Sequence, residues 1–277
     1  MGITAKNITK SYNSIKAIEN ISFEVKEGEL FGLIGPDGAG KTTIFRILTT
    51  LLLPDSGTAT VAGFNITDYK SIRKCVGYMP GRFSLYQDLT VEENLNFYAT
   101  IFGTTMQANY ELVKYIYEHI EPFKNRRAAA LSGGMKQKLA LCCALIHKPT
   151  VLFLDEPTTG VDPVSRKEFW EMLKRLQQKG ISILVSTAYM DEAGLCDRVA
   201  LIQNGKILHL DTTENITLSF PKKVYALKTK NTYQAINDLE NYRHTHSIYP
   251  FGEYLHYIDE REGVSMDELN DYLIQKG

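Results

Sequence analysis

The spacing of hydrophobic positions changes repeatedly along the chain and predicts a mixed α/β fold. Alternating apolar residues over 18–25 predict a strand, and the apolar run 30–34 predicts a buried one. Over 42–53 the spacing becomes that of an amphipathic helix, which Pro54 and the residues after it are expected to stop. Short strands are expected near 58–61 and 76–79.

The middle of the chain predicts a helical segment inserted into a parallel sheet. Residues 91–124 have helical spacing, and a helical subdomain is expected at about 84–136. Residues 151–154 and 181–186 are buried-strand candidates separated by an amphipathic helix, 165–179. A strand–helix–strand unit of this kind predicts parallel pairing.

Residues 215–277 are expected to form a small α/β accessory domain after a main domain at 1–214. The pattern predicts strands at 224–227 and 254–258 and helices at 232–239 and 266–274. So short a segment could hardly fold alone. Regulatory, dimerising and inert roles fit it equally well.

Composition narrows the class of protein. A net charge of −1, with 44% hydrophobic and 23% charged residues, is typical of a soluble globular protein. It argues against a nucleic-acid binder that works through bulk charge. No run approaches the roughly 18 apolar residues of a membrane span, and the first residues lack a secretion signal. If the protein serves a membrane, we expect another chain to supply the spans.

A glycine-rich segment between a predicted strand and a predicted helix matches the phosphate-binding P-loop pattern. Its glycines let backbone N–H groups turn towards a phosphate, and the helix N-terminus adds favourable partial charge. Lys41 is expected to reach the β- and γ-phosphates, and the Thr42 hydroxyl to ligate Mg²⁺. The candidate nucleotide-binding residues are Gly35, Pro36, Asp37, Gly38, Ala39, Gly40, Lys41, Thr42 and Thr43.

Two adjacent acids follow the apolar residues 151–154. Asp155 stands where a carboxylate on the Mg²⁺ side belongs, and Glu156 is placed to orient and deprotonate an attacking water. A solvated turn is the alternative, but it fits poorly after a fully apolar strand.

The segment Leu131–Gly134 begins a predicted helix. Ser132 is a suitable N-cap, so one reading is simply a capped helix. Gly133 and Gly134 would each cost about 0.5–1 kcal/mol within a first turn. A bare helix N-terminus that receives an anion explains the two glycines better.

Taken in order, these segments resemble the ATP-binding subunit of an ABC transporter, over about residues 1–214. The resemblance implies a P-loop NTPase cassette with a RecA-like core, an antiparallel β subdomain and a helical insertion. It implies that Ser132, Gly133 and Gly134 act on ATP held by a second cassette. The two cassettes would form either a homodimer or a heterodimer. Tyr12 is similar in position to the family's aromatic residue that stacks on adenine. The alternative is that Tyr12 is an ordinary tyrosine on the surface. Asp162 matches the loop that communicates across the dimer.

Three positions depart from the family pattern. Gly81 replaces a glutamine that touches Mg²⁺ and water, Ala188 replaces a histidine that contacts the γ-phosphate, and Asp37 replaces an asparagine. The change at Asp37 is the milder one, whereas positioning groups such as the glutamine and the histidine are worth roughly 10²–10³ in rate. The losses predict a chain that hydrolyses ATP slowly at its own P-loop and completes a competent site on its partner. Alternatively, Glu156 is sufficient for ATP hydrolysis at this site without the glutamine and the histidine, or Gln87 substitutes for the missing glutamine.

The sequences of these motifs are most similar to those of export-type ABC subunits. Such subunits pair with separate transmembrane permease chains. The resemblance therefore implies an Mg²⁺-dependent ATPase on the cytoplasmic face of the cell membrane, docked through residues 82–89 and the helical insertion. No nucleic-acid partner is expected. The alternatives are a soluble, non-transport ABC ATPase and a nucleotide-gated scaffold that binds without turnover.

Overall fold

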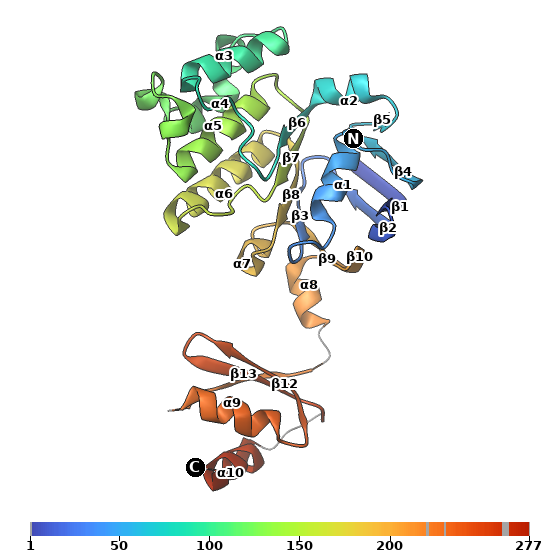
Figure 1. The fold of residues 1–277 in the computed structure, drawn as a ribbon, viewed down its shortest axis with the longest axis vertical. Coiled ribbons are helices and arrows are strands. Elements are labelled where there is room, and N and C mark those ends of the chain that lie inside the picture. Colours follow the sequence, from blue (N-terminus) through green and yellow to red (C-terminus); the bar gives the residue numbers. More distant parts are fainter. Residues whose placement is uncertain (1, 220–221, 230, 262–265, 277) are drawn as a thin grey trace. The chain divides into compact units, whose positions relative to one another are not determined.

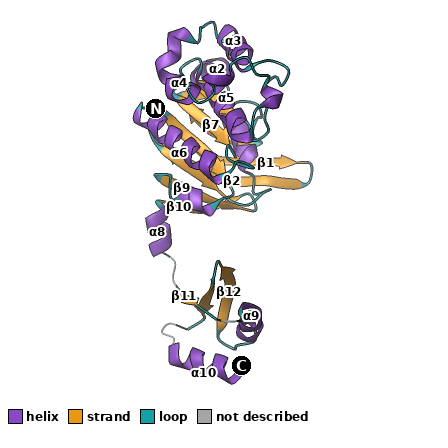
Figure 2. Cartoon of the chain, turned by 90° about the vertical axis from the view of Figure 1, so that its left-hand side faces the viewer, coloured by secondary structure: helices purple, strands orange, loops and turns teal. Residues whose placement is uncertain are grey.

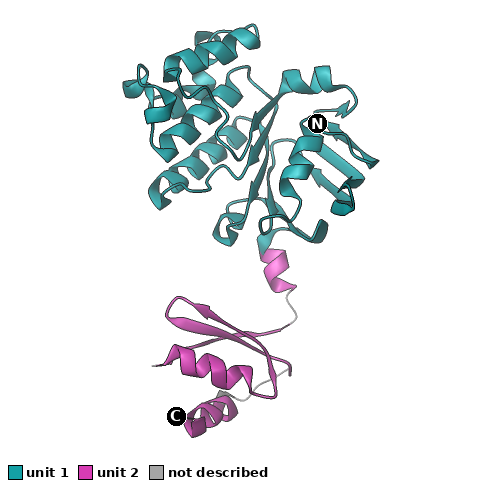
Figure 3. Cartoon of the chain, viewed as in Figure 1, with its two compact units in different colours: residues 1–213 teal, residues 214–277 magenta. Residues whose placement is uncertain are grey.

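The computed structural model describes residues 2–219, 222–229, 231–261 and 266–276. The chain divides into two compact units, residues 1–213 and 214–277 (Figure 3). Unit 1 has two sheets and unit 2 has one, and each unit has its own hydrophobic core.

Unit 1 begins with an antiparallel sheet in the order β2-β1-β4-β5. Its strands are β1 (Ile3–Tyr12), β2 (Ile15–Val25), β4 (Ser56–Val61) and β5 (Phe64–Asn65). Apolar side chains that alternate along β1 and β2 supply one face of the core, among them Ile3, Ile8 and Ile21. This sheet is the antiparallel subdomain that the sequence predicts.

The second sheet is mostly parallel, in the order β10-β9-β3-β8-β7-β6. Its strands are β3 (Leu30–Ile34), β6 (Val76–Met79), β7 (Val151–Asp155), β8 (Ser182–Thr187), β9 (Arg198–Gln203) and β10 (Lys206–Asp211). All pairs are parallel except the edge pair of β9 and β10. Strands β3, β7 and β8 are buried throughout, as expected for strands covered on both faces.

Helix α1 (Lys41–Leu48) contacts strands of both sheets, including β7, β2 and β4 (Figure 1). It is shorter than the predicted helix 42–53. The main chain leaves the helical conformation at Thr49, and Thr50 has φ +62°. The helix therefore ends before Pro54, because the local turn rather than the proline terminates it.

The other helices of unit 1 are α2 (Tyr69–Cys75), α3 (Val91–Ile101), α4 (Tyr110–Tyr117), α5 (Gly133–Leu145), α6 (Pro163–Gln178) and α7 (Met190–Ala193). Of these helices, α3, α4, α5 and α6 lie together, whereas α2 lies beside β5 and β6, and α7 lies beside β3 and β8 (Figures 1 and 2). Short 3₁₀ turns connect them at Gln107–Asn109, Glu121–Phe123 and Ala128–Ala130. Thr90 and Glu93 form a capping box that fixes the start of α3.

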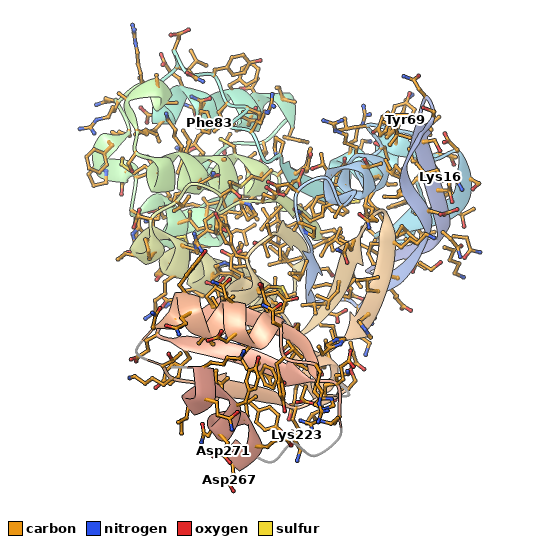
Figure 4. The ribbon with its side chains drawn as sticks, turned by 60° about the horizontal axis from the view of Figure 1, so that its bottom comes forward. Lys16, Tyr69, Phe83, Lys223, Asp267 and Asp271 are labelled. Carbon is orange, nitrogen blue, oxygen red and sulfur yellow. The ribbon has the colours of Figure 1, made fainter. Side chains whose placement is uncertain are left out.

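Unit 2 contains a three-stranded antiparallel sheet in the order β11-β13-β12. Its elements are α8 (Thr213–Leu218), β11 (Val224–Leu227), α9 (Thr232–Glu240), β12 (Thr245–Phe251), β13 (Tyr254–Asp259) and α10 (Met266–Lys276). Leu239, Leu255, Tyr257 and Leu269 form its core. Figure 4 shows Asp267 and Asp271 projecting from α10 at the surface.

Candidate functional site

The P-loop lies between β3 and α1, at the carboxyl edge of the parallel sheet. Gly40 is the N-cap of α1 with φ +105°, and a Cβ there would meet the carbonyl oxygen of Ala17 at 2.6 Å. Only glycine satisfies both the backbone conformation and the close approach. The following helix N-terminus then faces the loop, as a phosphate site requires.

Lys41 is buried and held over the loop by three oxygen atoms. Its ammonium donates to the carbonyl oxygens of Gly35 at 2.7 Å and Pro36 at 3.0 Å. Its Nζ also lies 3.0 Å from the Glu156 carboxylate. The Asp37 carboxylate is more distant, at 3.9 Å, and its side chain is 90% exposed. The structure thus brings together the two motifs that the sequence placed 115 positions apart (156 minus 41).

The two acids at the end of β7 occupy different environments. Asp155 is buried, and its carboxylate accepts a hydrogen bond from the Ser186 hydroxyl at 2.7 Å. Burial raises the pKa of Asp155, while hydrogen bonds from Ser186 and Thr42 act in the opposite direction. The Ser186 hydroxyl on β8 therefore holds this carboxylate, and the Thr42 hydroxyl on α1 lies near enough to lower its pKa.

Glu156 is partly exposed and has φ +51°, a left-handed conformation that costs a residue with a side chain about 1–3 kcal/mol. Its backbone N–H donates to the Ser186 hydroxyl at 3.0 Å and to the Ser186 carbonyl at 3.1 Å. Backbone contacts from β8 thus hold the residue in this conformation, with its carboxylate towards Lys41.

Gly81 lies against these same acids. A Cβ at this position would meet the carbonyl oxygen of Asp155 at 3.0 Å and the Cβ of Glu156 at 3.9 Å. A side chain at position 81 would therefore stand beside the acid pair. Ala188 follows the end of β8 and is exposed. Neither residue offers a polar side-chain atom to the site. Gln87 is exposed, and its carbonyl oxygen accepts from the Ala129 amide at 3.0 Å.

The start of α5 lies beside the start of α6. Ser132 caps α5 by accepting a hydrogen bond from the Met135 amide at 3.4 Å, and Asp162 caps α6 by accepting from the Ser165 amide at 2.9 Å. The bond from the Ser165 amide lowers the pKa of Asp162. The sequence did not show why position 134 requires glycine. In the structure a Cβ on Gly134 would meet the Ser165 hydroxyl oxygen at 2.7 Å. A Cβ on Gly133 would meet its first neighbour only at 3.7 Å.

A buried hydrogen bond links the loop after Glu156 to the helix after Ala188. The Thr158 hydroxyl donates to the Glu192 carboxylate at 2.6 Å, and the Arg166 side chain lies 3.7 Å from the same oxygen. Both Thr158 and Glu192 are almost fully buried. No pattern within either short segment could reveal this pair, because it depends on tertiary packing.

Tyr12 ends β1 and is 41% exposed. A groove of about 460 Å³ lies elsewhere on unit 1, between the end of β6 and helices α3 and α5. Its lining is mainly apolar and includes Met79, Leu85, Tyr98, Ile101, Phe102 and His147. The Phe102 ring stacks on the His147 ring at 3.8 Å between centroids. Phe83, near this groove, lies on the helical side of unit 1, away from Lys16 and Tyr69 (Figure 4).

Comparison with known proteins decides the family. A family model described as "ABC transporter" matches residues 18–159, which is more than half of the chain. The chain belongs to this family. The predicted family and the predicted fold class are therefore confirmed.

Curated relatives support this assignment. The chain is 42% identical to the probable multidrug ABC transporter ATP-binding protein YbhF of Escherichia coli, over 77% of this chain and 38% of that protein. It is 41% identical to a Nod factor export ATP-binding protein I of Burkholderia lata, over 74% and 68% of the respective chains. The chain thus spans about two fifths of the first relative.

Solved structures agree with the fold. An ATP-binding subunit of an ABC transporter superposes with a TM-score of 0.72 at 28% identity, covering 79% of this chain and 93% of that one. The dimeric structure of MJ0796, a bacterial ABC transporter cassette, gives a TM-score of 0.68 at 25% identity, covering 76% and 98%. Of the helices in the described part of this chain, none is long and apolar enough to cross a membrane.

Proposed function

We propose that this cassette binds Mg-ATP and powers export through a separate transmembrane permease. The observation that carries the proposal is the convergence of Lys41, Asp155 and Glu156 at one edge of the parallel sheet. These residues supply a phosphate-binding ammonium, a buried carboxylate and a second, more accessible carboxylate. Groups of these kinds hold the phosphates, the metal ion and the attacking water in phosphoryl transfer.

The residues present fit a magnesium ion. Mg²⁺ prefers oxygen ligands, and the Thr42 hydroxyl and Asp155 carboxylate are oxygen donors within hydrogen-bonding reach of one another. In this proposal those two groups hold the ion beside the phosphates, where it would neutralise charge on the phosphoryl group.

Glu156 acts as the base that orients and deprotonates water. In the structure its carboxylate pairs with Lys41. A phosphate that takes over the Lys41 ammonium competes for this contact and frees the carboxylate. Nucleotide binding and the release of the base are thereby coupled through one lysine.

The remaining assigned residues act in a dimer. Ser132, Gly133 and Gly134 at the start of α5 receive the γ-phosphate of ATP held by a second cassette, and Asp162 communicates between the two sites. Tyr12 stacks on adenine. Two structures of one relative, MJ0796, support a dimer: one is of the dimeric cassette, and the other is of a dimeric post-hydrolysis state bound to ADP and Pi.

The chain's own site is attenuated, because Gly81 and Ala188 supply no polar side chain where the family has glutamine and histidine. Position 81 adjoins Asp155 and Glu156, so a side chain there would begin beside both acids. Two curated relatives carry names that include multidrug or Nod factor export, and we infer export as the transport direction here too. The permease would place the cassette on the cytoplasmic face of the membrane.

Mg-ATP turnover of the purified chain, measured beside Glu156→Gln, tests this function. Low turnover that disappears in Glu156→Gln, with ATP binding retained, is the expected result. The double variant Gly81→Gln/Ala188→His should then raise turnover by about 10²-fold or more. Full turnover by the wild-type homodimer would contradict attenuation, and a chain that does not bind ATP would overturn the function itself.

A nucleotide-gated scaffold is the second candidate, favoured by the same two substitutions. It predicts tight ATP binding with no turnover in the wild type, and no gain from restoring glutamine and histidine. The intact Glu156, held towards Lys41, favours the ATPase.

A further inference from the structure

Ser186 occupies a central place at the reaction edge of the sheet. It lies in β8, which is flanked by β3 on one side and β7 on the other. In the strand register Ser186 is paired with Asp155, and the next residue, Thr187, is paired with Ile34 immediately before the P-loop. Ser186 is therefore the β8 residue directly beside the acid pair.

One hydroxyl makes two contacts there. Ser186 Oγ donates to the Asp155 carboxylate at 2.7 Å and accepts from the Glu156 backbone N–H at 3.0 Å. Its carbonyl oxygen accepts from the same N–H at 3.1 Å. Ser186 is fully buried, so no water competes for these bonds.

The two contacts serve different acids. The bond to Asp155 orients a carboxylate proposed to face Mg²⁺, and Thr42 is the second hydroxyl that contacts it. The bonds from the Glu156 amide hold a residue whose φ of +51° is unfavourable for a side chain. Gly81, which adjoins both acids, has no side chain to share this task.

We propose that Ser186 is a positioning residue for ATP hydrolysis. Its hydroxyl holds the Asp155 carboxylate and the Glu156 backbone in a fixed position relative to each other. The inference rests on the proposed roles of these two acids and adds a buried residue that acts through them. It also explains how the acid pair remains ordered without a side chain at position 81.

The chain offers a matched control in Ser182. This residue is also buried in β8, and its hydroxyl also accepts a backbone N–H, that of Gly28 at 2.9 Å. It lies at the opposite end of the strand from the acid pair. Ser182→Ala therefore removes a similar buried hydroxyl without touching Asp155 or Glu156.

The test uses the full chain and Mn²⁺ as a spin probe for the metal bound with ATP. Outer hydrogen-bond partners of metal ligands typically contribute about 10–100-fold in affinity or activity. We expect Ser186→Ala to weaken Mn²⁺ binding in the presence of ATP and to lower kcat by that factor. Its affinity for ATP in EDTA should stay unchanged. Ser182→Ala should retain wild-type Mn²⁺ affinity and kcat.

A second variant separates the hydroxyl from its packing. Ser186→Thr keeps a hydroxyl and should recover most of the Mn²⁺ affinity, whereas Ser186→Cys, a weak donor of similar size, should resemble Ser186→Ala. Equal Mn²⁺ binding by wild type and Ser186→Ala overturns the inference, as does an equal loss in Ser182→Ala or no recovery in Ser186→Thr. Failure of the wild type to bind ATP would instead overturn the proposed function. Because Mn²⁺ binding needs no turnover, an attenuated wild type does not prevent the test.

Discussion

The Lys41 ammonium lies 3.0 Å from the Glu156 carboxylate, so the phosphate-binding group and the proposed base form an ion pair with each other. Lys41 is buried and Glu156 is largely so, which limits screening of this pair by solvent. A phosphate must compete with Glu156 for Lys41. We therefore expect the affinity for ATP to be set in part by a residue that we propose as the hydrolytic base.

We therefore expect Glu156→Gln to bind ATP more tightly than wild type while hydrolysing it more slowly. The substitution removes the negative charge that pairs with Lys41, while the carbonyl oxygens of Gly35 and Pro36 continue to accept from its ammonium. The gain should be about three- to tenfold in Kd, corresponding to roughly 1 kcal/mol. Calorimetric titration with ATP in EDTA measures it. An unchanged or weaker affinity would show that the ion pair does not oppose binding.

Gly134 and Gly133 should respond differently to alanine. The Cβ of Gly134→Ala would lie 2.7 Å from the Ser165 hydroxyl, which forces α5 and α6 apart. We expect a loss of about 1–3 kcal/mol in unfolding free energy, typical of overpacking. Gly133→Ala is the matched control, since its Cβ has ordinary contacts.

Urea unfolding of both variants checks this expectation. Combining Gly134→Ala with Ser165→Gly removes the clashing side chain and should recover part of the loss. If Gly134→Ala and Gly133→Ala are equally stable, the close approach of the two helices has no energetic consequence.

The apolar groove beside β6 is the expected docking site for the permease. Ile101 lines it and is 60% exposed, so Ile101→Asp should leave folding and ATP binding intact. A charge placed in an apolar interface costs several kcal/mol when it is unpaired. We expect loss of the membrane-bound fraction in cells that express the cognate permease. Leu208→Asp, an exposed position on β10 outside the groove, is the control. Equal membrane binding by both variants would place docking elsewhere.

Unit 2 contains a buried acid whose charge should make its stability depend on pH. Burial raises the pKa of Asp259, but hydrogen bonds from Arg261 and Tyr257 outweigh this and lower it to about 2. A lowered pKa stabilises the fold above the unfolded value of 3.8, and the contribution disappears as pH falls towards 2. This contribution of Asp259 to the free energy of unfolding is about 2 kcal/mol.

Hydrogen exchange of the β13 amides in the full chain, measured from pH 5 to pH 2, reports this contribution. Protection in wild type should fall across the range after correction for intrinsic exchange. Asp259→Asn should lack this component, whereas Asp271→Asn, which removes an exposed aspartate on α10, should retain it (Figure 4). The same profile for wild type and Asp259→Asn would assign the stability to other groups.

The sequence by itself determined the local elements and the family. Strand β11 was predicted with its observed bounds and β6 was predicted at about its observed place, because a short apolar or alternating run between turn-forming residues is a local signal. The strand β12 was missed, since its burial follows no alternation and becomes ordered through pairing with β13. Helix α1 was predicted too long because its end depends on a turn at Thr50 rather than on hydrophobic spacing.

The chemistry of the site was decided by tertiary structure. The sequence could nominate Lys41, Asp155 and Glu156 as residue types suited to ATP, but their ion pair and their contacts with Ser186 arise where β3, β7 and β8 end at one edge. Similarly, Gly134 had a possible role from its helix position, yet its close approach to Ser165 depends on how α5 meets α6. Sequence patterns indicate the secondary structure that each segment favours. Strand order, register and helix packing determine which side chains then meet, because those contacts join residues far apart along the chain.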